Sequence, residues 1–205
     1  MGLDKLDRSS NVAPPPRRWL LPAIVLIAAS GLLLAGETGR ELLRFDRAGI
    51  GSGEIWRLVT GHFVHLGWPH FTLNAAGLLL VWYIVGNVFD TQRWLLVSCA
   101  SLLSMDVGFW LLDPDLMWYV GLSGLLHGIL AAGLVEKLKK PDAETIALAV
   151  LVLAKLAWEQ VNGPLPGSEG TSGGAVVVDS HLFGALGGVV AAMLFRIRVR
   201  PGAPI

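Results

Sequence analysis

The stretch Gly121-Leu122-Ser123-Gly124 places a serine between two glycines at the start of an apolar run from Leu125 to Val135. Glycines on both sides leave the hydroxyl uncovered and free a backbone N–H beside it, and a nucleophile with an oxyanion site needs both. Small residues also occur where membrane helices simply pack closely. On this stretch alone, packing and chemistry are both open.

Three other side chains complete the candidate chemistry. His181 would act as the general base toward Ser123 and later as the general acid. His70 and Asn74 are four residues apart and share one face of a helix, so with the backbone N–H of Ser123 they would form an oxyanion site. No acid in a predicted span is obviously placed to orient His181, so the sequence predicts a dyad and not a triad. A lone histidine of this kind could also be an interhelical hydrogen-bond donor.

The composition indicates a membrane protein. The 205 residues are 53% hydrophobic and 16% charged, whereas about a quarter of a soluble domain is charged. A net charge of zero gives no electrostatic case for a nucleic-acid partner. The single cysteine, Cys99, excludes an internal disulfide and a zinc-type cysteine spacing. We therefore expect an integral membrane protein in contact with the lipid bilayer, without a cofactor and without a metal.

The elements that would position these residues are six apolar segments, most of them near the roughly 20 residues that cross a bilayer. The fold class expected is all-α, a polytopic membrane protein of six transmembrane helices. Residues 1–16 are polar, end in three prolines and are predicted to form a disordered cytoplasmic tail, followed by a membrane domain over 17–200. The predicted spans cover 19–35, 70–89, 92–112, 121–135, 143–160 and 176–197.

The basic residues are unevenly distributed between the two sides of the predicted bundle. Those before the first span, between the second and third, between the fourth and fifth, and after the sixth all fall on one face, which the positive-inside rule makes cytoplasmic. Both termini are then cytoplasmic. The long first loop, 37–69, carries four arginines on the opposite face, balanced by four acids. Two short segments in it, each joining apolar and basic residues, are predicted to lie at the membrane interface.

This topology brings the polar residues to one level. The second, fourth and sixth spans begin on the non-cytoplasmic side, and a rise of about 1.5 Å per residue puts His70, Asn74, Ser123 and His181 at a similar shallow depth. Polar groups within spans are costly and mark function or mutual pairing. The small residues of 184–188 would let the sixth span pack tightly on the fourth. The shared depth favours catalysis over packing.

Taken together, these residues resemble the rhomboid intramembrane serine proteases from about residue 54 to 195. The resemblance implies a rhomboid-like six-helix bundle with a membrane-embedded first loop, a Ser123–His181 dyad, and oxyanion contacts from His70 and Asn74. It also implies supporting roles for residues of the first loop and of the serine motif, with His65 bracing that loop by hydrogen bonds. The matching residues are Trp56, Arg57, His65, His70, Asn74, Gly121, Ser123, Gly124 and His181.

The finer pattern resembles the rhombosortase branch of that family, in the stretches 60–70, 121–128 and 155–160. That branch processes bacterial proteins with a GlyGly-CTERM tail, which consists of a Gly-rich motif, an apolar helix and basic residues. The resemblance implies single-pass membrane protein substrates with such C-terminal tails. It also implies a bacterial inner membrane location, with the active site facing the periplasm. Hydrolysis and transfer to another nucleophile, such as an amine or a lipid, are both open.

The chain departs from the rhomboid pattern at His127, where rhomboids often carry an aromatic residue. His127 lies one turn after Ser123 and is expected to pack on His181 or on the backbone of the sixth span. A role as a second base is open, because nearby histidines can titrate in the working range.

Lys155 and Glu159, four residues apart near the outer end of the fifth span, form either a simple ion pair or a contact with the substrate tail together with Trp158. Asp106 could join them. His62 has no assigned role, and a metal site built from His62, His65 and His70 lacks the carboxylate that such sites use.

Two other functions stay open. A non-catalytic rhomboid-like protein would bind single-span clients, but it would not need both Ser123 and His181. A transporter would place charged residues along a path through the midplane, whereas here the polar residues cluster near one face.

Overall fold

The computed structural model describes residues 18–198 and is almost entirely helical. The predicted tail 1–16 lies outside these residues. Six long helices follow the six predicted apolar segments, and their ends lie within about four residues of the predicted ones. They are α2 (Leu20–Leu34), α6 (Trp68–Val85), α7 (Thr91–Leu111), α8 (Ser123–Lys137), α9 (Ala143–Asn162) and α11 (Val178–Arg198).

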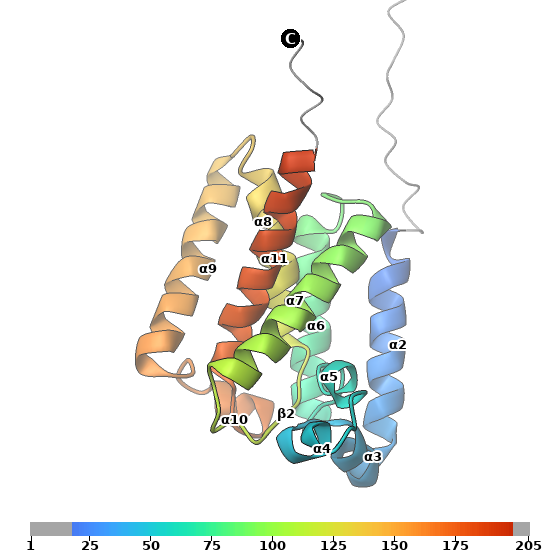
Figure 1. Ribbon diagram of the computed structural model, residues 1–205. Coiled ribbons are helices and arrows are strands. Elements are labelled where there is room, and N and C mark those ends of the chain that lie inside the picture. Colours follow the sequence, from blue (N-terminus) through green and yellow to red (C-terminus); the bar gives the residue numbers. More distant parts are fainter. Residues whose placement is uncertain (1–17, 199–205) are drawn as a thin grey trace, which may run out of the picture.

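The short elements gather at one end of the bundle (Figure 1), the end at which α6, α8 and α11 begin. They are α3 (Gly36–Leu43), β1 (Phe45–Asp46), α4 (Arg47–Gly51), α5 (Arg57–Thr60), β2 (Trp118–Tyr119) and α10 (Ser168–Ser172). The two strands were not expected in an all-α chain. The helix α10 lies in the stretch 162–174, which is rich in glycine, proline and serine.

Helix starts are set by local chemistry. Asp90 precedes α7 and its carboxylate accepts from the backbone N–H of Arg93 at 2.8 Å, and Asp142 caps α9 through Thr145 at 2.7 Å. Such caps satisfy N–H groups that the first helical turn leaves unpaired. Pro69 lies in the first turn of α6, where its missing N–H costs nothing.

Three helices, α6, α7 and α11, are long and apolar enough to cross a membrane, or four if α2 and α3, bent by 114° to one another, form one broken span. The helix α8 has 15 residues and is largely buried by its neighbours. The helix α9 has 20 residues, but three of them, Glu144, Lys155 and Glu159, are charged. The number of six spans therefore stays a prediction.

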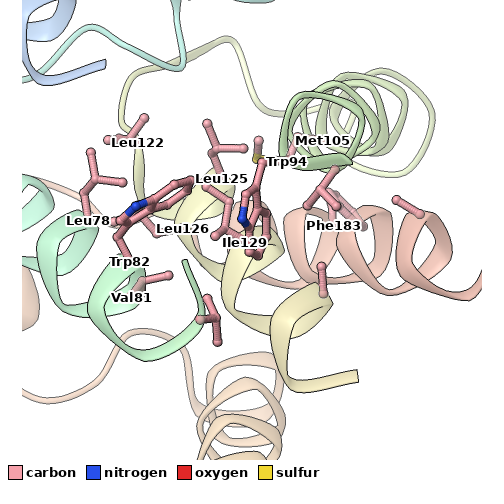
Figure 2. Packing of buried hydrophobic residues seen from close by; sticks show 14 of the residues in the cluster. Leu78, Val81, Trp82, Trp94, Met105, Leu122, Leu125, Leu126, Ile129 and Phe183 are labelled. Atoms are coloured by element: carbon pink, nitrogen blue, oxygen red, sulfur yellow. The ribbon is translucent and has the colours of Figure 1, made fainter. Parts of the chain in front are cut away.

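The helix α8 lies at the centre of the core. Figure 2 shows Trp82 and Trp94 beside Leu125 and Ile129 of α8, and the two indole rings lie 5.5 Å apart. Interlocking aromatic and aliphatic side chains of this kind hold the helices in place relative to one another.

Glycines bring α8 and α11 into backbone contact. A Cβ on Gly184 would overlap the backbone oxygen of Gly124, and a Cβ on Gly188 would overlap that of Gly128. Close approach through small residues is how membrane helices gain packing contact. This confirms the prediction that the small face of residues 184–188 packs on the fourth span, and it fixes the residues near the start of α11 against α8.

A two-strand pairing ties the first loop to the chain just before Ser123. Phe45 pairs with Tyr119 and Asp46 with Trp118, antiparallel. The neighbouring Arg47 donates to the backbone oxygens of Leu116 at 3.0 Å and Asp113 at 2.7 Å. The first loop therefore supports the segment that leads into α8.

Candidate active site

Gly121 shapes the approach to the serine. Its φ is +134°, a conformation that side chains rarely allow, and a Cβ there would lie 3.1 Å from Nε2 of His70. The buried Tyr119 hydroxyl donates to the Gly121 oxygen at 2.6 Å. Burial raises the pKa of Tyr119 to about 12, so this hydroxyl stays protonated and keeps its bond. Ser123 is then the first residue of α8, and its N–H has no partner within the helix.

Ser123 and His181 meet as predicted. The Oγ of Ser123 lies 3.0 Å from Nε2 of His181, in hydrogen-bond range. His181 stands on the first turn of α11, a helix that its glycines hold against α8. A serine hydroxyl bonded to an imidazole nitrogen is the arrangement that turns a weak nucleophile into an active one.

The expectation that no acid orients His181 is wrong. The Nδ1 of His181 lies 2.9 Å from Oε2 of Glu159, and Oε1 of the same carboxylate lies 2.7 Å from Nζ of Lys155. The ion pair, one of the two alternatives for Lys155 and Glu159, is present within α9, and its carboxylate also binds the histidine. The sequence places Glu159 near the outer end of the fifth span, but it does not indicate which face of that helix turns toward His181.

His127 packs on His181 as expected. The two rings stack with centroids 4.2 Å apart and planes 22° apart. The Nδ1 of His127 lies 2.8 Å from the backbone oxygen of Ser123, and only a protonated Nδ1 can donate to a carbonyl. His127 is thus held by its own helix, while its ring supports the face of His181.

His70 and Asn74 lie on α6 beside the serine. The backbone N–H of Leu66 donates to Nδ1 of His70 at 3.3 Å, which leaves the ring proton on Nε2. Asn74 is buried and donates one amide hydrogen to the oxygen of His70 at 3.2 Å, with its second amide hydrogen left over. Both side chains line the same cavity as Ser123 and have a donor available there.

That cavity measures about 540 Å³. Its floor is Ser123 with the polar side chains described above, and its walls come from the apolar residues Leu73, Val120 and Leu126. The chain from Leu165 to Val177, which includes α10, covers one side. The cavity is large enough for several residues of an extended peptide beside the serine.

Three groups of this site could also offer metal ligands. Donor atoms of His127, Glu159 and His181 all lie within 4.8 Å of one another. However, the ammonium of Lys155 lies 2.7 Å from Glu159 and 3.3 Å from Nδ1 of His181. A positive charge at that place opposes a cation, so the donor set fits a chain of hydrogen bonds better than a metal ion.

The predicted supporting residues Trp56 and Arg57, and the predicted substrate contact Trp158, lie outside the cavity. Arg57 is buried in the first loop, where it pairs with Glu54 at 2.5 Å and donates to the backbone oxygens of Glu41 and Arg44 at 2.8 and 3.0 Å. Trp56 donates to that loop at Leu42. These contacts shape the loop without reaching the serine. Trp158 is 46% exposed and is not among the residues that line the cavity.

Two expectations about the remaining polar groups are wrong. Asp106 does not join Lys155 and Glu159, but lies 3.1 Å from Nε2 of the buried His62. His65 does not brace the loop by hydrogen bonds, since neither of its ring nitrogens has a partner among the described residues. It packs edge-on against His70 and Phe71 instead.

The amino-acid sequence matches known rhomboid proteins over most of its length. The rhomboid domain matches residues 52–198 of the chain. The putative rhomboid protease YdcA of Bacillus subtilis is 24% identical over 155 residues, which cover 76% of this chain and 74% of that protein. The rhomboid protease GluP of Bacillus subtilis is 29% identical over 106 residues, covering 51% of this chain and 20% of that protein. The uncharacterized protein Rv1337 of Mycobacterium tuberculosis is 27% identical over 192 residues, covering 86% and 76%.

Proposed function

The chain belongs to the rhomboid family, and on that premise we propose that it is a serine endopeptidase that cleaves membrane-anchored proteins. The family and the apolar helices make it an integral membrane protein. The single observation that carries the proposal is the 3.0 Å contact between Oγ of Ser123 and Nε2 of His181. That contact also favours an enzyme over a non-catalytic protein that binds single-span clients, since binding alone would not require it.

The mechanism follows from the contacts. The Oγ of Ser123 attacks the scissile carbonyl carbon while its proton passes to Nε2 of His181. The negative charge that develops on the carbonyl oxygen is stabilised by the N–H of Ser123, the free amide hydrogen of Asn74 and the Nε2 proton of His70. His181 then protonates the leaving amine, and water, or another nucleophile, releases the acyl group from Ser123.

The donor role proposed for His70 requires a residue without a side chain at position 121. Because a Cβ at Gly121 would lie 3.1 Å from Nε2 of His70, any side chain there would crowd the nitrogen that faces the substrate oxygen. Glycine is therefore needed at this position for two reasons: its positive φ allows the turn into α8, and its missing Cβ leaves the oxyanion site open.

For the substrate we propose the rhombosortase class, single-pass proteins with a Gly-rich motif, an apolar helix and basic residues at the C-terminus. The cavity supports this, because it lies at one end of the bundle where a substrate helix would emerge from lipid, and glycines would let that helix unwind into it. With this class we place the protein in a bacterial inner membrane, with both termini cytoplasmic and the site facing the periplasm.

A fluorophosphonate probe tests the activity. We expect the purified protein in detergent to be labelled, and labelling to fall at least a thousandfold in Ser123→Ala and in His181→Ala. Ser168→Ala is the matched control, because Ser168 lines the same cavity but its hydroxyl bonds only the backbone of Leu165. A folded protein that is not labelled, or one whose labelling survives in Ser123→Ala, would contradict the proposal.

A tail reporter tests the substrate class. A soluble domain carrying a Gly-Gly motif, an apolar helix and three basic residues should be cleaved when co-reconstituted with the protein in liposomes. Changing Gly-Gly to Val-Val should abolish cleavage, because glycine lowers the cost of unwinding the helix into the cavity, whereas valine has a stiff, branched side chain that restricts the backbone. Equal cleavage of both tails would exclude the Gly-rich motif as the recognised feature.

A further inference from the structure

Glu159 is a buried carboxylate that the serine–histidine mechanism above does not use. It is 3% exposed, although it stands on α9 near the edge of the bundle, and it accepts from His181 at 2.9 Å. The other polar groups near His181 are Ser123 and His127 on α8 and Lys155 on α9. Of the two groups in contact with Nδ1 of His181, the carboxylate of Glu159 and the ammonium of Lys155, only the carboxylate can accept its N–H.

Lys155 offsets part of the free-energy cost of burying this carboxylate. Its amine lies 2.7 Å from Oε1 of Glu159, one helical turn away. An isolated buried carboxylate is costly, and a hydrogen-bonded cation offsets much of that cost. Lys155 also lies 3.3 Å from Nδ1 of His181, but an ammonium has no acceptor for an N–H. The carboxylate is therefore shared, with one oxygen on the lysine and one on the histidine.

We propose that Glu159 is the positioning residue of His181 and makes the site a serine–histidine–glutamate triad. This inference rests on the proposed peptidase function and deepens it. The carboxylate holds Nδ1 in its protonated form, so that the lone pair of Nε2 faces Ser123. When the Ser123 proton moves to Nε2, the charge of Glu159 stabilises the imidazolium. No proton passes to Glu159 at any step.

The location of Glu159 couples the base to α9. Few side chains of this helix are buried, namely Thr145, Leu156 and Glu159. An apolar cavity of about 420 Å³ lies between α9, α8 and α11. Ser123 lies on α8 and His181 on α11, and these two helices are in close contact through glycines. Glu159 lies on α9, which buries few side chains. Ser123 is therefore fully activated only while the outer end of α9 is docked on α11.

Replacing the carboxylate of Glu159 by a neutral amide tests whether Glu159 positions His181. In Glu159→Gln the shape is kept and the charge lost, and we expect kcat on a tail reporter to fall by about 10²–10⁴-fold, with KM within about threefold. Glu159→Asp should recover part of the loss. The matched control is Glu144→Gln, because Glu144 is an exposed glutamate on the same helix. A Glu159→Gln enzyme with the kcat of the parent would overturn the inference.

Chemical rescue separates positioning from mere stability. In Glu159→Ala, added formate should restore probe labelling in a concentration-dependent way, since a small carboxylate can enter the cavity that Glu159 lines. A variant that is inactive because its packing has changed would not respond, and absence of rescue together with loss of the folded form in Glu159→Gln would overturn the positioning role. If the parent protein itself is not labelled, the proposed peptidase function fails, whereas a labelled parent with an unaffected Glu159→Gln defeats the triad alone.

Discussion

Within residues 18–198, two buried histidines each bind a carboxylate, and the two pairs differ in what faces the second ring nitrogen. In one pair His181 binds Glu159 at 2.9 Å, and in the other His62 binds Asp106 at 3.1 Å. The second nitrogen of His181 meets the hydroxyl of Ser123 at the edge of the large cavity. The second nitrogen of His62, Nδ1, has no partner among the described residues.

The surroundings explain the difference. His62 is 0% exposed and its ring packs against Phe109 and Tyr119, with centroids 6.3 and 5.4 Å away. It ties the first loop to α7 behind the serine. A histidine and an acid in contact are therefore not sufficient for catalysis, because the pair becomes a base only when the remaining nitrogen reaches a hydroxyl that substrate can also reach.

The largest effect is expected for His62→Leu. The change leaves Asp106 partly buried without its partner, so we expect the free energy of unfolding in detergent micelles to fall by about 3–5 kcal/mol. The labelling rate of the protein that remains folded should stay that of the parent. The double variant His62→Leu/Asp106→Leu should recover most of the stability. A lower labelling rate in folded His62→Leu would make this pair part of the chemistry.

His65 is a buried histidine with no carboxylate partner among the described residues. Burial, and then the neighbouring His70, lower the pKa of His65 to about 4 from 6.5. Between these values the unfolded chain binds the proton more readily, so stability rises with pH over that range and is lost as pH falls. His65→Phe should remove about 2 kcal/mol of the stability difference between pH 7.5 and pH 5, as measured by unfolding in micelles. An unchanged pH slope would show that His65 does not titrate in this way.

The smallest effect is expected at His127. His127→Phe keeps a ring at the stacking distance of 4.2 Å from His181 and loses one bond to the oxygen of Ser123. We expect probe labelling to fall by less than about tenfold, which corresponds to roughly 1 kcal/mol. His127→Ala should lose more, because it removes the stacked ring as well. If labelling survives in His181→Ala but is lost in His127→Phe, His127 and not His181 is the base.

The sequence predicted the long helices and the level at which Ser123 and His181 meet, because apolar runs and a fixed rise per residue determine depth. It did not predict which faces of the helices meet, since that depends on how each helix is rotated about its own axis. Glu159 and Asp106 illustrate this. Their histidine partners lie 22 and 44 residues away in the chain, and only the packing of α9 on α11 and of the first loop on α7 brings them together.

The contacts of Arg47 affect when the first loop can fold during synthesis of the chain. Arg47 binds the backbone oxygen of Leu116, which lies 69 residues later in the chain. At roughly 5–20 residues per second, synthesis needs about 3–14 s to supply that residue. Until then the first loop lacks both Arg47's acceptors and the strand that pairs with Phe45 and Asp46. The first loop therefore cannot complete the contacts that hold the approach to Ser123 until β2 has been synthesised.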